Sequence, residues 1–352
     1  MFRFTVFCFL LTSLCLLTPP LCHGRNVLYT VGVDAYENDW ADVRYCLAND
    51  AIFFGDNIYS YDSTYWSECT SSVSFFNNTS HTIDYTYGFP TEATVRTTIQ
   101  NYAATLTAGD LFVFFFSGHG GLTGGTDAFL CCYDDNGRYE DTELAADLSL
   151  FANGVTVICI IHSCHSGGMF KGQTATAKWP FAKNVMDYVS SIQQSKGMVA
   201  KAPNLAFFTS CDYDESSWGG ANFSIFGRYL IEALGHGDTN GDGRLTFYEM
   251  YEYVAPRAKA DVVAYGHPDD QDAQVFNEAL LQTTYAVTNT GATGNDNTNP
   301  RITSAGGGSS GCSVATTHAA HWSLFLPWLS LLILSFFSRL VRLYGRYALC
   351  QR

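Results

Sequence analysis

One stretch of this chain reads LFVFFFSGHGG over residues 111–121, with six consecutive apolar residues before a polar turn. An uninterrupted apolar run of this length is typical of a strand that is buried on both faces of a sheet. A second stretch, VTVICIIHSCHSGG over residues 155–168, repeats the arrangement. Both predicted strands therefore end in a glycine-rich turn that carries a potentially reactive side chain.

The segments around these two runs alternate between strand-like and helix-like patterns. Short apolar runs bounded by turn residues predict strands, and apolar residues at helical spacing predict helices between them. This alternation indicates βαβ units, so we predict an α/β fold with a mostly parallel central sheet and helices on both faces. The predicted strands are Asn26–Val33, Ser72–Phe76, Leu111–Phe116, Val155–Ile161 and Asn204–Phe208, and the predicted helices are Val43–Tyr59, Glu92–Leu106, Asp141–Phe151 and Phe226–Leu234.

The turns at the two strand ends carry a histidine and a cysteine. Reactive groups in open α/β sheets collect in loops just past the carboxyl ends of strands, and His119 and Cys164 both occupy that place. A cysteine needs thiolate character to attack a carbonyl group, and a nearby imidazole supplies it. The backbone N–H groups of Gly120 and Cys164 could form an oxyanion hole. The pair therefore predicts nucleophilic catalysis by Cys164, with His119 as its partner.

The same side chains have other chemical uses. A histidine in a tight glycine-rich loop is often held by backbone contacts alone, and Cys164 could be a disulfide partner. The histidines and the cysteine of the two turns could also bind zinc, but the sequence has no paired Cys-x-x-Cys or spaced histidine pair to complete such a site. The presence of both turns in one chain favours catalysis over these alternatives.

The two turns resemble the paired motifs of metacaspases and caspase-like peptidases. They read SGHG at residues 117–120 and SCHSG at residues 163–167, each after an apolar strand. Legumain-type peptidases are similar in outline, and the resemblance extends over roughly residues 27–274. It implies a caspase–haemoglobinase fold and hydrolysis of peptide bonds through an acyl-enzyme. In that scheme Cys164 would attack, His119 would carry the proton, and Gly120 would contribute to the oxyanion hole.

The resemblance also indicates a pocket for P1, the substrate residue on the acyl side of the cut. Metacaspases have an aspartate two residues before the nucleophile, which holds a basic side chain, whereas this chain has His162. Arg44 lies where legumain-like peptidases have an arginine that favours Asn or Asp. Asp50 and Ser117 instead match metacaspase positions that help hold a basic side chain, and the lysine-rich segment 171–201 lies where caspase relatives are often cut. We predict Asn or Asp at P1, because a carboxylate that would pair with a cation is missing.

The segment DTNGDGRLTFYE, residues 238–249, fits the twelve-residue calcium loop of EF-hand proteins. Oxygen donors occupy loop positions 1, 3, 5 and 12, and a glycine occupies the sharp turn. EF-hands usually occur in pairs and the sequence has no second loop, so a loop that never binds calcium is the alternative. We predict calcium as a ligand and no organic cofactor, with ligand positions at Asp238, Asn240, Asp242, Arg244 and Glu249.

The ends of the chain predict a secretory protein with a membrane anchor. Residues 1–24 have the basic, apolar and small-residue zones of a signal peptide, and residues 25–284 contain the catalytic domain with its calcium loop. Residues 285–318 are rich in Thr, Gly, Asn and Ser and predict a flexible stalk. Residues 319–337 lack charged side chains and have the length of a membrane-spanning helix, and a basic tail follows at residues 338–352.

This order of segments predicts a domain outside the cytosol and a tail inside it. We therefore expect a type I membrane protein of the secretory pathway, at the cell surface or in an endolysosomal or vacuolar membrane. The hydrophobic segment could instead be a glycolipid-attachment signal, but such signals normally end at the apolar tail. Asn77 and Asn78 begin N-glycosylation sequons, and some of the cysteines between Cys46 and Cys312 could form disulfides in that compartment.

The net charge limits the partners of the protein. The 352 residues carry a formal charge of −14, which repels phosphate backbones, so we exclude nucleic acid and expect polypeptide substrates. Two other functions remain compatible with the sequence. One is a transamidase or ligase that resolves the same acyl-enzyme with an amine, and the other is a catalytically silent calcium-binding surface protein. The intact pair of His119 and Cys164 argues against the silent form.

Overall fold

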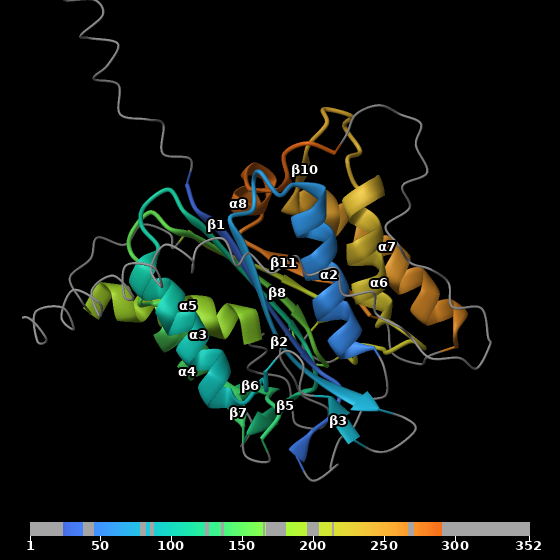
Figure 1. Ribbon diagram of the computed structural model, residues 1–352, viewed down its shortest axis with the longest axis horizontal. Coiled ribbons are helices and arrows are strands. Elements are labelled where there is room, and N and C mark those ends of the chain that lie inside the picture. The colour runs from blue at the N-terminus through green and yellow to red at the C-terminus, as the bar shows by residue number, and fades with distance from the viewer. Residues whose placement is uncertain are drawn as a thin grey trace, which may run out of the picture. The chain divides into compact units, whose positions relative to one another are not determined.

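The computed structural model describes residues 24–37, 46–77, 82–84, 88–123, 127–134, 137–164, 166, 181–195, 204–212, 215–266 and 271–290. The chain divides into two compact units, residues 1–302 and 303–352, and all the described residues belong to the first. A seven-stranded sheet forms the centre of this unit. The fold is therefore built from one large sheet and the helices that cover it (Figure 1).

The large sheet is mostly parallel, as predicted. Its strand order is β11-β9-β8-β4-β1-β2-β3. The five inner strands run parallel to one another, and the outermost strand on each side, β11 or β3, is antiparallel to its neighbour. The strands are β1 (Asn26–Val33), β2 (Glu68–Asn77), β3 (Thr82–Asp84), β4 (Leu111–Ser117), β8 (Thr156–His162), β9 (Leu205–Thr209) and β11 (Gln274–Phe276).

Helices cover both faces of this sheet (Figure 1). Alternate residues of β4 and β8 belong to two separate apolar cores, because successive strand side chains point to opposite faces. The first core includes Phe114 and Cys159, and the second includes Phe115 and Ile160. Helices α3 (Glu92–Thr105), α4 (Asp141–Leu148) and α5 (Phe181–Ser195) pack on the first, whereas α2 (Leu47–Tyr61), α6 (Ile225–His236), α7 (Phe247–Ala264) and α8 (Glu278–Thr283) pack on the second.

Every strand and helix predicted above is present, with shifted ends in most cases. Thr91 caps α3, since its hydroxyl accepts a hydrogen bond from the backbone of Thr94. Two small sheets, the short strands β3 and β11, and helices α5 and α8 were missing from the prediction. The small sheets contain the three strands β5 (Gly120–Thr123), β6 (Asp127–Cys131) and β7 (Arg138–Glu140), and the two strands β10 (Leu245–Thr246) and β12 (Tyr285–Val287).

Strand β12 corrects the predicted boundary of the stalk. The stalk was expected from residue 285, but residues 285–290 belong to the folded domain. Ala286 and Val287 are fully buried, and the indole of Trp66 donates to the carbonyl of Ala286 at 2.9 Å. Asp62 accepts a hydrogen bond from the backbone of Thr288 at 2.9 Å. Composition suggested a flexible segment here, because the two apolar residues that pack are too few to form a recognisable pattern.

The described cysteines are all free, which differs from the expectation of disulfides. They are Cys46, Cys69, Cys131, Cys132, Cys159, Cys164 and Cys211. Cys159 is fully buried in the first core, as its place in an apolar strand suggested. The predicted signal peptide, the predicted membrane span 319–337 and the basic tail lie outside the described residues. In the ranges that the structure does describe, no helix combines the length and the apolarity needed to cross a membrane.

Candidate active site

The register of β4 and β8 brings the predicted catalytic pair to one edge of the sheet. The two strands are parallel neighbours, and Ser117 is paired with His162 at their carboxyl ends. The next residue of β4, Gly118, donates its backbone N–H to the carbonyl of His162 at 3.0 Å. His119 and Cys164 each lie two residues beyond this register pair, on strands that are about 4.8 Å apart. The two residues therefore follow the carboxyl ends of neighbouring strands, at equivalent positions past the register pair.

His119 is held by the ends of two neighbouring elements. Its backbone N–H donates to the hydroxyl of Tyr36 at 2.8 Å, and Tyr36 is a fully buried residue just after β1. The two rings also contact each other, with centroids 5.4 Å apart. On its other side, the carbonyl of His119 accepts from the backbone of Cys131 at 2.9 Å. The imidazole is thus positioned by β1 and by β6 as well as by its own strand.

Cys164 sits half-buried in a turn that the end of β9 supports. Its thiol donates to the carbonyl of Ser217 at 3.6 Å. The preceding carbonyl, that of Ser163, accepts from the hydroxyl of Ser210 at 3.4 Å and from the thiol of Cys211 at 3.3 Å. Burial raises the pKa of the Cys164 thiol above its ordinary value, although the contact with Ser217 lowers it in part. The Cys164 side chain is therefore a thiol that would need a base to become a nucleophile.

Gly120 lies where the two turns touch. A Cβ atom on Gly120 would be 2.6 Å from the carbonyl oxygen of Cys164 and 2.9 Å from the hydroxyl of Ser163, which no side chain can tolerate. Gly120 is paired with Leu130 in an antiparallel ladder, next to the hydrogen-bonded pair formed by His119. Because such ladders alternate, the N–H of Gly120 points away from β6. The glycine allows the close approach of the two backbones.

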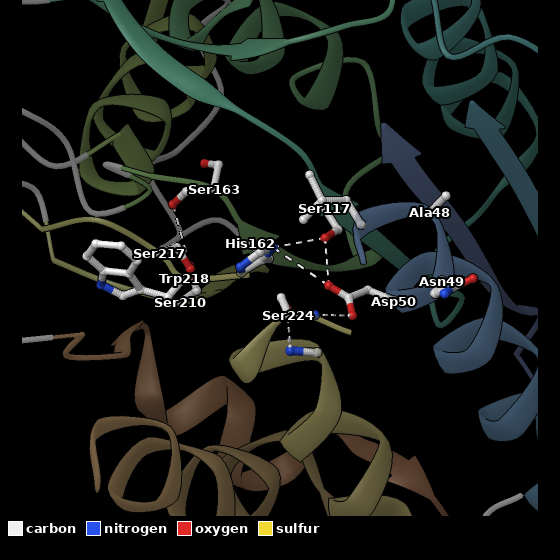
Figure 2. Close-up of polar contacts among 12 residues, drawn as sticks. Ala48, Asn49, Asp50, Ser117, His162, Ser163, Ser210, Ser217, Trp218 and Ser224 are labelled. Carbon is white, nitrogen blue, oxygen red and sulfur yellow. Dashed lines mark hydrogen bonds and ion pairs between the residues drawn. The ribbon is translucent and has the colours of Figure 1, made fainter. Parts of the chain in front are cut away.

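Three of the four predicted P1-pocket residues form one buried hydrogen-bonded chain, the carboxylate relay of Asp50, Ser117 and His162 (Figure 2). The Ser117 hydroxyl lies 2.9 Å from Oδ2 of Asp50 and 2.9 Å from Nδ1 of His162. Nδ1 itself lies 3.8 Å from the carboxylate. Asp50 and Ser117 are fully buried and His162 is 2% exposed. The fourth predicted residue, Arg44, lies outside the described residues.

Helices α2 and α6 place Asp50 in this chain. The carboxylate of Asp34, just after β1, accepts from the backbone of Leu47 at 2.8 Å and so anchors the start of α2. One turn later, Oδ1 of Asp50 accepts from the backbone of Ser224 at 3.0 Å, at the start of α6. Helix α6 comes so close that a Cβ atom on Gly227 would be 2.1 Å from Oδ1. The second glycine of the site therefore makes room for the carboxylate.

Burial shifts the pKa values of both titratable groups in the relay, and in each case the shift favours the neutral form of the group. Burial raises the pKa of Asp50 to about 7, and its hydrogen bonds with Ser224 and Ser117 offset part of this effect. Burial lowers the pKa of His162 to about 3, with a smaller contribution from the charge of His119. His162 is therefore a neutral imidazole at physiological pH, and Asp50 changes its charge near neutrality.

Several polar atoms around the relay are buried without a hydrogen-bond partner among the described residues. They are Nε2 of His162, the hydroxyls of Ser163 and Ser217, and the amide nitrogen of Gln271. The amide oxygen of Gln271 accepts from the backbone of Trp218 at 3.0 Å. Because an unpaired buried polar group costs free energy, such a cluster beside a thiol is typical of a site that a ligand or water completes.

Sequence reasoning did not find four residues that shape this site. They are Tyr36, Ser217, Ser224 and Gln271. Ser217 follows β9, and its place in a loop past a strand end could have drawn attention to it. Tyr36 also follows a strand, but Ser224 and Gln271 carry no local signal, because only the packing of α6 and of the segment before β11 brings them in.

The loop between α6 and α7, residues 238–249, is closed by its own side chains. Asp238 accepts hydrogen bonds from two backbone N–H groups of the loop, at 2.8 and 2.9 Å. Asn240 donates its amide to Glu249 at 2.7 Å. Glu249 also accepts from the backbone and the hydroxyl of Thr246, both at 2.9 Å, in the capping box that starts α7. The last predicted ligand is therefore already engaged.

The remaining predicted ligands of the loop also have contacts of their own. Asp242 accepts from the backbone of Arg244 at 2.8 Å. Arg244 occupies loop position 7, which would contribute its backbone carbonyl, and its guanidinium lies over the ring of Tyr285, 5.2 Å from the centroid. Across the described part of the chain, no group of three or more His, Cys, Asp or Glu side chains converges as a metal site. The loop oxygens suit calcium in kind, but the amide of Asn240 would have to give up its contact with Glu249.

Comparison with known proteins assigns the class of this fold and site. The sequence matches the caspase domain family over residues 36–283. The chain therefore belongs to the caspase domain family and is a cysteine peptidase-like enzyme. No curated protein matches the chain.

Many solved structures are similar to it, and two of them illustrate this similarity. One is the protein GSU0716 from Geobacter sulfurreducens, with 22% identity, a TM-score of 0.48, and coverage of 73% of this chain and 96% of that one. The other is caspase-1 from Spodoptera frugiperda, with 13% identity, a TM-score of 0.45, and coverage of 72% of this chain and 86% of that one.

Proposed function

We propose that this protein is a cysteine endopeptidase that cuts polypeptides through an acyl-enzyme on Cys164, with His119 as the acid and base. The observation that carries the proposal is the common sheet edge at which these two side chains follow a register pair of neighbouring strands. Membership of the caspase domain family supports the reaction class. Gly120 and the close contact of the two turns support an oxyanion hole between them.

The chemistry follows from the state of the resting thiol. His119 removes the proton of Cys164, and the thiolate attacks the carbonyl carbon of the scissile bond. The developing oxyanion accepts hydrogen bonds from the backbone N–H groups of Gly120 and Cys164. The C–N bond then breaks, and the leaving amine takes the proton from His119. Water, deprotonated by His119, hydrolyses the thioester and releases the acid and the free thiol.

A quenched fluorescent peptide library on the full chain tests this function. Cleavage should disappear in Cys164→Ala and persist in Cys69→Ala, which makes the same change at a partly buried cysteine of β2. Cleavage that survives Cys164→Ala would refute the proposal. The same experiment with an added amine nucleophile separates hydrolysis from transfer, because a transferase would yield the amide.

For P1 we propose Asn or Asp. The support is the neutral imidazole of His162 at the place of the usual aspartate, with Asp50 and Ser117 behind it. A basic P1 side chain would lose its hydration in this pocket. It would find no carboxylate free to pair with it, because Asp50 already accepts hydrogen bonds from Ser117 and Ser224. A library profile dominated by Arg or Lys would contradict this preference.

We further propose that the loop 238–249 binds calcium weakly. Its oxygen donors and its place between two helices support the proposal. Binding would replace the contact of Asn240 with Glu249, so the affinity should be low. Isothermal titration of calcium into the full chain tests it, and absence of heat at millimolar calcium would leave the loop with a structural role.

The proposed location is the secretory pathway, with residues 319–337 as a single membrane span. The signal-like start and the apolar segment before a basic tail support it. An epitope placed after Arg352 should remain on the mature protein and face the cytosol. Loss of the epitope, with release of the domain by a phospholipase, would instead demonstrate a glycolipid anchor.

A further inference from the structure

The carboxylate relay ends in one buried atom that has no partner among the described residues. His162 is 2% exposed, and its Nε2 has no hydrogen-bond partner among the described residues. Figure 2 shows its ring with Ser117 and Asp50 on one side and Ser217 and Trp218 on the other. The carbonyl of Ser217 is 3.6 Å from the thiol of the nucleophile. This other side of the ring therefore faces the segment whose Ser217 carbonyl contacts the thiol of Cys164.

We propose that the relay of Asp50, Ser117 and His162 determines the P1 residue by presenting Nε2 to it as a hydrogen-bond acceptor, so that asparagine is preferred to aspartate. This inference rests on the proposed peptidase function and narrows its P1 preference. An asparagine amide donates to such a nitrogen, whereas an ionised aspartate can only accept. A carboxylate facing a lone pair would lose its hydration and gain no bond.

The hydrogen bonds fix which ring nitrogen carries the proton. An ionised Asp50 can only accept, so Ser117 directs its single proton to Oδ2 of Asp50. The Ser117 oxygen must then accept from Nδ1 of His162, at 2.9 Å. The neutral ring has one proton, which is therefore on Nδ1, and Nε2 keeps its lone pair. The carboxylate acts on the substrate through two hydrogen bonds and does not touch it.

Protonation of Asp50 reverses every bond in this chain. A protonated Asp50 donates to Ser117, Ser117 donates to Nδ1, and the ring proton is then on Nε2. The relay has gained one proton and His162 remains neutral. In this form Nε2 donates, so it can pair with the carboxylate of a P1 aspartate or with the carbonyl of an asparagine. Because burial raises the pKa of Asp50 to about 7, the reversal falls near neutral pH.

The surroundings of the relay do not supply a competing proton donor for Asp50. Among the titratable groups near the relay, Asp34 and Cys46 add negative charge when ionised, and His119 adds positive charge when protonated. At the start of α6, the backbone N–H of Ser224 donates to Asp50, and the ring of Phe226 stacks on His162. The groups are Asp34 after β1, Cys46 before α2, His119 after β4, the backbone of Ser224, and Phe226, whose ring stacks on His162 at 5.9 Å.

The tautomer of His162 tests the relay without any substrate. Nitrogen NMR on the full chain with labelled histidine distinguishes a protonated ring nitrogen from one with a lone pair, and His162→Gln identifies the signals. We expect the proton on Nδ1 at about pH 8 and on Nε2 at about pH 6, and loss of this change in Ser117→Ala. A proton on Nε2 at both pH values would overturn the relay, whether or not the protein cleaves peptides.

Matched peptides with Asn or Asp at P1 test the selectivity. We expect kcat/KM to be about tenfold or more higher for Asn at about pH 8, and this ratio to fall severalfold by about pH 6. The P1 aspartate ionises near pH 4, so its own titration lies outside this window. Ser117→Ala should make the ratio independent of pH between these values, with similar rates of Cys164 alkylation as evidence of an intact site. The proposal would be overturned if the pH dependence of the Asn-to-Asp ratio were unchanged in Ser117→Ala, or if the protein preferred Arg or Lys at P1.

Failure of the parent function gives a different result. If neither peptide is cleaved but the His162 tautomer changes with pH and responds to Ser117→Ala, the relay stands and the peptidase function falls. If peptides are cleaved by Cys164 while the tautomer does not change, the peptidase function stands and the relay falls.

Discussion

This chain has two chemical motifs, one at the edge of the sheet where β4 and β8 end and one in the loop 238–249. The two regions differ in how their side chains are held in place. At the sheet edge, the register pair of Ser117 and His162 fixes the positions of the residues that follow. In the loop, the acidic side chains accept hydrogen bonds from the loop itself. The first region has buried polar atoms without a partner, whereas the second engages its polar side chains with one another.

The difference indicates where function is preformed. Strands that are buried on both faces cannot shift without disturbing two apolar cores, so groups at their ends keep their geometry. A loop closed by its own hydrogen bonds must reorganise before it binds an ion, and that reorganisation lowers its affinity. Changes at the sheet edge should therefore have larger effects than changes in the loop.

Loss of the catalytic pair should have the largest effect. Cys164→Ala and His119→Ala should each lower kcat/KM by about 1000-fold or more, because they remove the nucleophile and its proton carrier. His236→Ala is the matched control, since His236 is an exposed histidine at the end of α6. Steady-state kinetics with the best library peptide measures these values. A decrease in kcat/KM of less than tenfold for either variant would contradict the larger effect expected at the sheet edge.

Gly227→Ala should have the next largest effect, on stability as well as on activity. The added methyl group would be 2.1 Å from Oδ1 of Asp50, inside a fully buried contact. We expect a loss of about 1–3 kcal/mol in the free energy of unfolding, the usual cost of overpacking. The control is Gly235→Ala, which lies exposed in the same helix and should be neutral or stabilising. Equal urea midpoints for the two variants would contradict the tight contact.

The pH dependence of stability should separate the two buried groups of the relay. Burial raises the pKa of Asp50 from 3.8 to about 7, so its contribution to stability is lost as pH rises from about 4 through 7. Burial lowers the pKa of His162 from 6.5 to about 3, so its contribution is lost as pH falls below about 6.5. Between about pH 4 and 6.5 the two slopes oppose each other.

The variant His162→Gln removes the contribution of His162 to the pH dependence of stability. Its free energy of unfolding should then increase as pH falls from about 7 to 4, by on the order of 1 kcal/mol per pH unit, while the unmodified chain stays nearly flat across that range. Urea titrations at several pH values provide the measurement. A variant that follows the slope of the unmodified chain would show that the two groups do not titrate as described.

Calcium should have the smallest effect. At millimolar concentration it should raise Tm by a few degrees, because a weak ligand stabilises only by mass action. The increase should vanish when Asp238→Ala and Glu249→Ala are combined. Thr246→Ala is an informative companion, since it removes the capping box but no predicted ligand, and it should cost about 1 kcal/mol with or without calcium. A calcium shift that persists in the double variant would remove the loop from this account.

Much of the fold could be predicted from the sequence, for physical reasons that differ between elements. The strands β4 and β8 are apolar on both faces, which only a buried parallel strand explains, and helix α3 begins at a side-chain cap. Helix α5 was missed although Ala182, Val185 and Val189 recur at helical spacing, because its segment was interpreted only as part of a lysine-rich loop. Strand β12 was missed because three residues are too short to show a period.

The site could be predicted only in part. The glycine-rich turns identify His119 and Cys164, since both follow recognisable strands. The contact of Asp50 with Ser224 joins residues that are 174 positions apart, and no local pattern announces it. The interpretation of Gly120 also changes, because its lack of a side chain serves the contact of the two turns and not only the approach of a substrate.

Trapping of the acyl-enzyme is the most direct test of the catalytic pair. The full chain is mixed with activated esters of peptides that end in Asn or Asp, quenched in acid, digested and analysed by mass spectrometry. The peptide acyl group should be found on Cys164, should be absent from Cys164→Ala, and should form about 1000-fold more slowly in His119→Ala. Acylation of another residue at the same rate, or an unchanged rate in His119→Ala, would contradict the assignment of Cys164 and His119.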